Sequence, residues 1–161
     1  MTIAKNLTKV RENIARAAKD AGLDERDILL IGATKMNDAA RVREAIAAGL
    51  TACGENRVQE LLEKNALGAY EGAQLHFIGH LQRNKVKQIV GLAQLIHSVD
   101  SVELMSAISR EAEKKGIVQD ILLEVNVAGE ASKSGIAPEN LPELLEKAGD
   151  FPGLRVRGLM A

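Results

Sequence analysis

A lysine stands where an apolar run of the sequence ends. Residues 28–34, ILLIGAT, are apolar or small, and Lys35 follows them directly. Partial desolvation at the mouth of a buried strand favours the neutral form of an amine. A neutral lysine amine is the nucleophile that forms a Schiff base with a carbonyl compound. The ordinary alternative is a lysine whose charged end reaches solvent at the rim of the fold, and position alone leaves both readings open.

Two later motifs place an amide and an imidazole in comparable positions. The segment 54–60, GENRVQE, carries Asn56, whose amide can orient a ring or a hydroxyl group of a ligand. Its structural alternative is a helix N-cap, with Gln59 bonding back as in a capping box. His76 opens the segment 76–85, HFIGHLQRNK, and its ring can stack on a ligand or bond to it. Such a histidine is more often a core residue with satisfied hydrogen bonds.

The histidine spacing does not indicate a metal centre. His76 and His80 are separated as a metal-binding pair on a helix would be, but a strand interrupted by Gly79 holds them too far apart. Cys53 is the only thiol. We therefore expect no metal site.

The apolar periodicity predicts the elements that position these residues. Strands are predicted at 28–34, 51–54, 74–79, 95–98, 118–127 and 154–160. Helices are predicted at 3–21, 39–48, around 58–62, and at 84–92, 100–115 and 138–149. Thr2 and Asp38 are the expected N-caps of the first two helices, and Asp100 with Glu103 resembles a capping box for the fifth.

Regular alternation of helices with apolar strands predicts an α/β fold with a parallel sheet covered by helices. Two closures remain open, a doubly wound sheet and part of a (β/α) barrel. In both, functional groups gather at the carboxyl ends of the strands, where Lys35 and Asn56 are expected. On the last strand, Arg155 and Arg157 are expected on an outer, partly solvated face. Met160 alternates with them toward the other face unless a bulge intervenes.

Composition excludes several classes of protein. The net charge is −1, so no general attraction to nucleic acid or to an acidic membrane is expected. Aromatic residues make up only 2% of the chain, which removes stacking platforms for single-stranded nucleic acid. No secretory leader, membrane span or nucleotide-binding glycine motif is recognisable. With one cysteine, the 161 residues fit a single α/β domain of a cytoplasmic protein.

Taken together, the motifs resemble a known family. The chain contains Lys35, then GEN-x-VQE at 54–60, HFIG-x-LQ-x-NK at 76–85, SKSG at 132–135 and RGLM at 157–160. This combination is similar to the pyridoxal phosphate homeostasis proteins, which are related to the N-terminal barrel of alanine racemase. The resemblance covers nearly the whole chain and is highly specific.

The resemblance implies a (β/α)8 TIM-type barrel, the type III fold of pyridoxal phosphate (PLP) proteins, with the cofactor at its C-terminal mouth. It implies a Schiff base between PLP and Lys35, and a cofactor pocket lined by Asn56. His76 and Met160 occupy positions near the cofactor ring in the family. Ser134 belongs to the SKSG segment, which matches a loop at the mouth.

The sequence departs from the family pattern at two places. Residues 34–36 are TKM where the family commonly has SKT, a change that keeps the amine. The family also continues after GLMA through two more βα units, which carry the phosphate-binding amides and an arginine facing the pyridine nitrogen. About six of eight strands are therefore expected here, with PLP binding impaired. The family is monomeric, and open strand edges here would favour association.

Three functions compete at this stage. The first is a protein of PLP homeostasis that holds the cofactor and passes it to PLP-dependent apo-enzymes, without catalytic turnover. The second is a PLP-dependent amino-acid racemase, which needs a second acid–base residue opposite the lysine. The sole tyrosine, Tyr70, is expected in a loop far from the strand ends. The third is a truncated scaffold that binds proteins and no cofactor.

Overall fold

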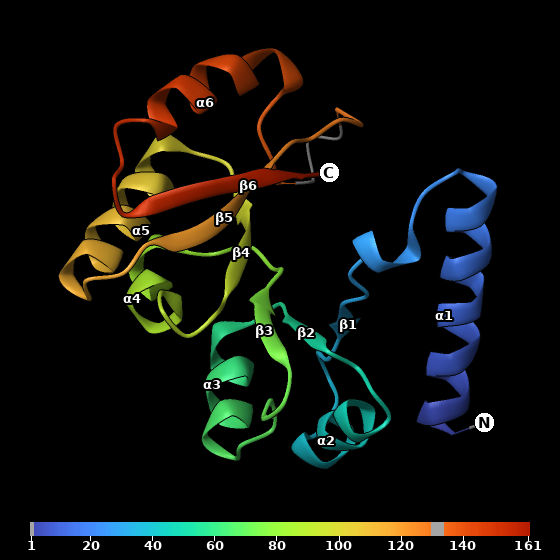
Figure 1. Cartoon of the computed structure of the whole chain (residues 1–161). Helices are drawn as coiled ribbons and strands as arrows, with labels where there is room; N and C mark the ends of the chain where they lie inside the picture. Colours follow the sequence, from blue (N-terminus) through green and yellow to red (C-terminus); the bar gives the residue numbers. More distant parts are fainter. Residues whose placement is uncertain (1, 130–133) are drawn as a thin grey trace.

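The fold is built on one parallel sheet, seen edge-on through the middle of Figure 1. The structure, a computed structural model, describes residues 2–129 and 134–161. Six strands are hydrogen-bonded in the order β1-β2-β3-β4-β5-β6. The strands are β1 Gly32–Ala33, β2 Ala52–Glu55, β3 Gln74–Phe77, β4 Leu95–Val99, β5 Gln119–Glu124 and β6 Leu154–Met160.

Helices connect the strands and precede the first one. The α-helices are α1 Ile3–Asp20, α2 Ala39–Ala47, α3 Val58–Ala66, α4 Val86–Ile89, α5 Val102–Lys114 and α6 Leu141–Ala148. Short 3-10 turns are η1 Glu25–Asp27, η2 Arg83–Lys85 and η3 Pro138–Asn140. Every strand after β1 is therefore reached through a helical crossover, which is how parallel strands are joined.

One face of the sheet carries the hydrophobic core. Helix residues such as Leu61 and Ile108 are fully buried in the same cluster as the strand residues Phe77 and Ile121. The core cluster takes residues from α2, α3, α4, α5 and α6, so these helices cover a single face. Alternate strand residues, among them His76, point to the other face.

The strand order distinguishes between the two closures. A doubly wound sheet reverses its strand order at a switch point and carries helices on both faces. Here each strand lies beside its sequence neighbour and helices cover one face, which is the arrangement of a barrel wall. Within the described residues, β1 and β6 each have one unpaired edge, as the sequence predicts.

The first strand is shorter than predicted. The apolar run suggests a buried strand at 28–34, but only Gly32–Ala33 form strand pairs. Ile28 and Leu29 are 40% and 49% exposed. β1 is an edge strand and pairs with β2 only. Residues 28–31 of the apolar segment therefore have no strand to pair with on the other side.

The helix caps were partly predicted. Thr2 and Asp38 accept hydrogen bonds in the first turns of α1 and α2, as expected. The N-cap of α5 is Ser101, whose hydroxyl accepts from the Leu104 amide at 3.3 Å, so the capping box based on Asp100 is wrong. Asp100 and Ser101 are adjacent residues that both suit a cap, and sequence spacing alone did not separate the two.

The helix predicted at 84–92 is also different. It is divided into the 3-10 turn η2 and the single-turn helix α4, and Asn84 lies inside η2 instead of capping a helix. Gly91, with φ of 79°, follows in the left-handed conformation that glycine adopts readily. Nowhere in residues 2–129 and 134–161 is a helix both long and apolar enough to cross a bilayer.

Candidate functional site

The strand register shows how far toward the carboxyl ends of the strands each candidate residue lies. Ala33 pairs with Gly54, and Gly54 pairs with His76, so these three residues form one layer across β1, β2 and β3. Lys35 and Asn56 each lie two residues beyond this layer, toward the carboxyl ends. The two therefore lie at one level along their strands, and His76 lies one layer deeper in the sheet.

Lys35 lies in a tight turn directly after β1, with its side chain exposed. The Asn37 amide donates to the carbonyl of Thr34 at 3.2 Å, and the Asn37 side chain donates to the carbonyl of Lys35 at 3.0 Å. Met36 has φ of 61°, which is unusual for a residue other than glycine. Its amide donates to Oε1 of Glu60 at 2.5 Å. The turn is thus bonded at each of its positions.

A buried polar cluster lies behind this turn, on the helix side of the sheet. Glu55 has no exposed surface, and its Oε1 accepts from the Thr34 hydroxyl at 2.6 Å and the Tyr70 hydroxyl at 3.0 Å. Lys64 donates to the same oxygen at 2.8 Å, to Oε1 of Glu60 at 2.7 Å and to the carbonyl of Thr34 at 2.7 Å. All three protons of the Lys64 ammonium are therefore used.

The charges of the cluster stabilise each other. Burial alone lowers the pKa of Lys64, but its hydrogen bonds to Glu55 and Glu60 outweigh burial and raise that pKa. The bond from Lys64 lowers the pKa of Glu60. Burial, together with the charge of Glu55, raises the pKa of Tyr70 far above its ordinary value, so its hydroxyl stays a proton donor. A similar environment raises the pKa of Cys53 to about 11.

Sequence reasoning missed this cluster and misplaced Tyr70. The tyrosine was expected far from the strand ends, but its hydroxyl bonds to Glu55, the last residue of β2. The sequence does indicate this cluster through Glu55, which ends the segment TACGE at 51–55. A carboxylate at the end of a buried strand requires a partner, so a cation or a hydroxyl group is expected nearby. The i, i+4 pair of Glu60 and Lys64 on a predicted helix is the second indication.

Asn56 does not cap α3. The N-cap is Arg57, which makes no side-chain cap bond, and Gln59 donates to Glu63 at 2.9 Å instead of bonding back. The side-chain Oδ1 of Asn56 is buried and has no hydrogen-bond partner among the described residues. Because an unsatisfied buried acceptor costs roughly 1–3 kcal/mol, this oxygen is a position where a ligand could supply the missing donor.

Two of the sequence motifs contact each other at Asn56. A Cβ placed on Gly79 would lie 2.1 Å from the carbonyl oxygen of Asn56 and 2.6 Å from its Cα. Gly79 therefore permits the chain after β3 to pass against the backbone after β2. This contact links the HFIG and GEN segments.

His76 is buried, at 2% exposure, and pairs with a second histidine. Oε1 of Gln74 only accepts, so His76 Nε2 carries a proton and donates to it at 3.2 Å. His76 Nδ1 then accepts from Nε2 of His97 at 2.9 Å. Burial lowers the pKa of His76, and burial with the neighbouring ring lowers the pKa of His97 to about 4. Both rings are therefore neutral at pH 7.

Met160 ends β6 and pairs in register with Glu124, the last residue of β5. The pairing shifts between Ile121 and Leu122, which leaves Arg157 as an extra residue in β6. This is the bulge on which the alternation of Arg155 and Met160 was conditional, and it brings the two residues to the same face. Arg155 bonds to Asp120 on the helix-free face at 2.6 Å, and Met160 lies on that same face.

Glu124 is a residue that sequence reasoning did not select. Its Oε2 is buried without a hydrogen-bond partner in the part of the chain that the structure describes. Burial, and then the charge of Asp100, raise the pKa of this carboxyl. It faces the same side of the sheet as Met160 and adds an acidic group at the carboxyl end of β5.

The loop after β5 carries Ser134, which is exposed. Ser132 and Lys133 of the same motif lie outside the described residues. The Gly135 amide donates to Oδ2 of Asp100 at 3.3 Å, and a Cβ on Gly135 would lie 2.8 Å from the amide nitrogen of Asn126. The loop is therefore anchored where β4 and β5 end.

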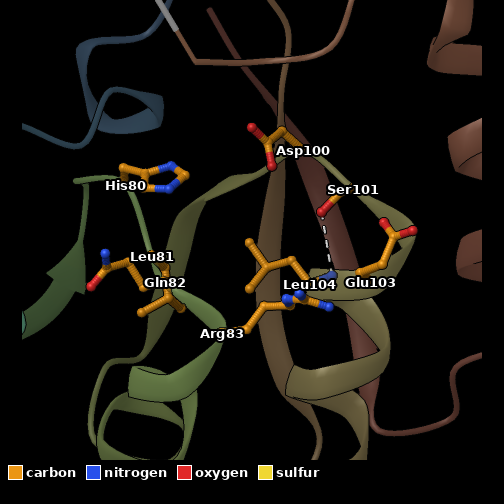
Figure 2. Close-up of a pocket in the computed structure, with 8 residues that line it drawn as sticks. All are labelled: His80, Leu81, Gln82, Arg83, Asp100, Ser101, Glu103 and Leu104. Atoms are coloured by element: carbon orange, nitrogen blue, oxygen red, sulfur yellow. Dashed lines mark hydrogen bonds between the residues drawn. The ribbon is translucent and has the colours of Figure 1, made fainter.

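A cleft of about 540 Å³ opens beside these strand ends, between the loop after β3 and the first turn of α5. Figure 2 shows His80 and Arg83 on one wall and Asp100 and Ser101 on the other. A second cleft, of about 370 Å³, is lined by Asn56, His80 and residues of α3. Neither is lined by Lys35.

By the strand register, Lys35 and Asn56 lie at one level beyond β1 and β2, and His76 lies one layer deeper on β3. Met160 and Ser134 lie at the same end of the sheet on β6 and after β5, and no contact links them to Lys35. No group of three or more metal-ligating side chains occurs within residues 2–129 and 134–161. The arrangement offers an exposed amine, an amide oxygen without a partner, and a neutral imidazole in adjacent layers.

Comparison with known proteins gives a consistent result. Residues 6–161 match the family model described as alanine racemase, N-terminal domain. The chain is 44% identical over 160 residues to the pyridoxal phosphate homeostasis protein of Aquifex aeolicus, and 46% identical to that of Pseudomonas aeruginosa. In both cases 99% of this chain is covered and about 70% of the relative.

A solved structure agrees with the fold. PipY from Synechococcus elongatus PCC7942, solved with PLP bound, matches with a TM-score of 0.81 and 32% identity. The match covers 99% of this chain and 69% of PipY. The expected α/β fold of the TIM-barrel type is confirmed, with six parallel strands of its wall present.

Proposed function

Because this chain belongs to the alanine racemase N-terminal domain family, we propose that it is a PLP-binding protein of pyridoxal phosphate homeostasis. The observation that carries the proposal is the layer formed by Lys35 and Asn56 at the carboxyl ends of β1 and β2. The names of its relatives, and the PLP bound to PipY, support the same cofactor.

The chemistry requires one covalent step at Lys35. Lys35 would hold PLP through its side-chain nitrogen, in a C=N bond to the aldehyde carbon that forms with release of water. Asn56 follows β2 at the same level, and its Oδ1, which has no partner among the described residues, can accept from a hydroxyl or a protonated group of the ligand. His76, held neutral and fixed by His97, closes the space below.

Met160 and Ser134 extend this site. We assign Met160 and Ser134 to the rim, where the first supplies an apolar wall from β6 and the second a hydroxyl from the loop after β5. Residues 1–161 are proposed to act as a single domain.

We assign no catalytic turnover to this site. A racemase needs an acid–base residue opposite the lysine, and the Tyr70 hydroxyl is committed to Glu55 on the helix side of the sheet. PLP-dependent apo-enzymes are the proposed recipients of the cofactor. A cytoplasmic location is proposed because the single cysteine, Cys53, is buried and unpaired.

Absorbance titration tests the proposal. Adding PLP to the wild-type protein is expected to produce the visible absorbance of a protein-bound Schiff base, saturating at one cofactor per chain. Lys35→Arg keeps the charge but cannot form the imine, and is expected to give no saturable signal. Equal titrations of the two proteins would rule out Lys35 as the site. Pyridoxal without phosphate, run in parallel, measures how much the phosphate contributes to binding.

A further inference from the structure

We propose that Lys64 and Glu60 are positioning residues for Lys35, fixing the backbone on both sides of it from behind the sheet. The inference rests on the proposed function, in which Lys35 is the residue that reacts. Neither residue is itself placed at the reacting atoms, and both belong to α3, whereas Lys35 follows β1.

The first contact holds the residue before Lys35. Nζ of Lys64 donates to the carbonyl of Thr34 at 2.7 Å. The Thr34 amide donates to the carbonyl of Gly54 at 3.0 Å, and its hydroxyl donates to Glu55 at 2.6 Å. Thr34 is 5% exposed, so the peptide entering Lys35 is fixed through bonds that water does not readily replace.

The second contact holds the residue after Lys35. The Met36 amide donates to Oε1 of Glu60 at 2.5 Å. Met36 is 91% exposed and has φ of 61°, so packing of its side chain does not explain this conformation. A left-handed conformation costs a residue other than glycine roughly 1–2 kcal/mol. The charge-assisted bond to the Glu60 carboxylate offsets that cost.

One ammonium group joins the two contacts. Lys64 Nζ bonds directly to the Thr34 carbonyl and, through Oε1 of Glu60, is linked to the Met36 amide, so one ammonium connects the peptide groups before and after Lys35. Lys64 is 6% exposed, and Glu55 completes its third bond. These hydrogen bonds fix the backbone of the turn in one conformation. The Lys35 side chain itself is exposed to solvent.

This arrangement affects reaction at Lys35 through orientation. An exposed lysine on a mobile turn samples many positions, whereas capture of an aldehyde beside Asn56 requires the amine at one of them. Holding a reacting group in place removes an entropic cost that is otherwise met during binding. Supporting hydrogen bonds behind a site are the usual means of doing so.

The test uses substitutions that alter the support and leave Lys35 intact. Lys64→Met removes the shared ammonium, and Glu60→Ala removes the acceptor of the Met36 amide. Glu60→Gln is the conservative variant, because its amide oxygen still accepts from Met36 and Lys64. Lys115→Met is the matched control, since Lys115 also donates to backbone carbonyls, those of Lys87 and Val90, but far from Lys35 in the fold.

Two quantities are measured on each variant. One is the PLP concentration for half-maximal trapping of Lys35 by borohydride, which should rise by about tenfold in Lys64→Met and Glu60→Ala. The other is hydrogen exchange at the Met36 amide without PLP, which should accelerate in the same two variants. Glu60→Gln and Lys115→Met should stay near wild type in both. Unchanged trapping and exchange in folded Lys64→Met or Glu60→Ala would overturn the inference.

The design separates this inference from the proposed function. Lys64→Met leaves the buried Glu55 without its cation and can lose the fold; Glu60 is partly exposed, so Glu60→Ala then carries the test. If the wild-type protein forms no adduct at Lys35, the proposed function fails. Exchange at Met36 still decides whether Lys64 and Glu60 hold the turn, and wild-type exchange in Glu60→Ala would refute that.

Discussion

At the scale of single residues, the Lys35 side chain and the backbone of its neighbours Thr34 and Met36 have different roles. The Lys35 side chain is exposed and makes no packing contribution, whereas its neighbours Thr34 and Met36 are hydrogen-bonded into a buried cluster. The Lys35 side chain is therefore the group proposed to react, while the backbone on either side of it contributes hydrogen bonds to the fold. A substitution of Lys35 should affect cofactor binding far more than folding.

The first prediction follows from this separation. Lys35→Ala should change the free energy of unfolding of the apo protein by no more than about 0.5 kcal/mol, as for other exposed positions. Urea unfolding of both proteins without PLP measures the difference. A loss of several kcal/mol would mean that the Lys35 side chain carries structural contacts that its exposure does not indicate.

The buried histidine pair gives a pH dependence. In the folded protein the pKa of His97 is about 4, below the value of 6.5 for an unperturbed histidine. The unfolded chain therefore binds the proton more readily, so stability falls as the pH drops from about 6.5 toward 4. Between pH 7 and pH 4.5 this residue should cost roughly 2 kcal/mol.

Denaturant unfolding at the two pH values measures that loss. His97→Asn, which cannot titrate, should reduce the difference between pH 7 and pH 4.5, whatever its effect at pH 7. An undiminished difference in this variant would show that other groups cause the acid sensitivity.

At the scale of elements, the sequence predicted features that depend on neighbouring residues better than features that depend on contacts between separate elements. The alternation of strands and helices, and the positions of Lys35, Asn56 and His76 at or near strand ends, followed from apolar periodicity. The strand order did not, because the periodicity fits a doubly wound sheet as well as a barrel. The caps at Thr2 and Asp38 were also predictable, because a cap depends on residues three apart in the sequence. Glu55 with its partners could not be assigned in this way, because its bonds join three separate elements.

Other errors have the same origin. The short β1 reflects its place at the edge of the sheet, and the bulge at Arg157 depends on the register against β5. Neither feature can be predicted from the local sequence pattern, because both depend on how separate strands pair. An N-cap was one of two readings of Asn56 because its residue type suits a cap, but in the structure the chain after β3 passes directly against its backbone.

That passage gives a prediction for Gly79. A methyl group at this position would overlap the backbone of Asn56, and backbone atoms cannot move aside as a flexible side chain can. Gly79→Ala should therefore destabilise the protein by roughly 2 kcal/mol or more, and should weaken PLP binding because it displaces Asn56.

Gly149→Ala is the matched control, since Gly149 has helical φ and its closest contact would be 3.3 Å. Melting temperatures of both variants, with PLP titrations, measure the two effects. Equal stability of the two variants would contradict the close approach at Asn56.

At the scale of the whole molecule, the six strands form an arc of barrel wall with two open edges. The chain spans about 70% of the length of the curated relatives it matches. Within the described residues, β1 and β6 leave backbone groups unpaired, and Leu159 on β6 is 54% exposed. Open edges of this kind favour pairing with another chain.

Residues 1–161 studied alone should therefore associate through β6. Sedimentation velocity should show a concentration-dependent increase in mass, and Leu159→Lys should reduce it, because a charged edge opposes strand pairing. Leu67→Lys is the control, since Leu67 is 66% exposed but follows α3. A monomer at all concentrations, or equal effects of the two lysines, would show that the β6 edge is not the contact.

The central claim is that Lys35 is the amine that holds PLP, and the location of the covalent adduct tests it most directly. The protein is incubated with PLP, reduced with borohydride and digested, and the modified peptide is identified by mass spectrometry. The account predicts one dominant adduct on Lys35 that is absent from Lys35→Ala. Labelling spread over surface lysines and unchanged in Lys35→Ala, or no adduct at all, would contradict it.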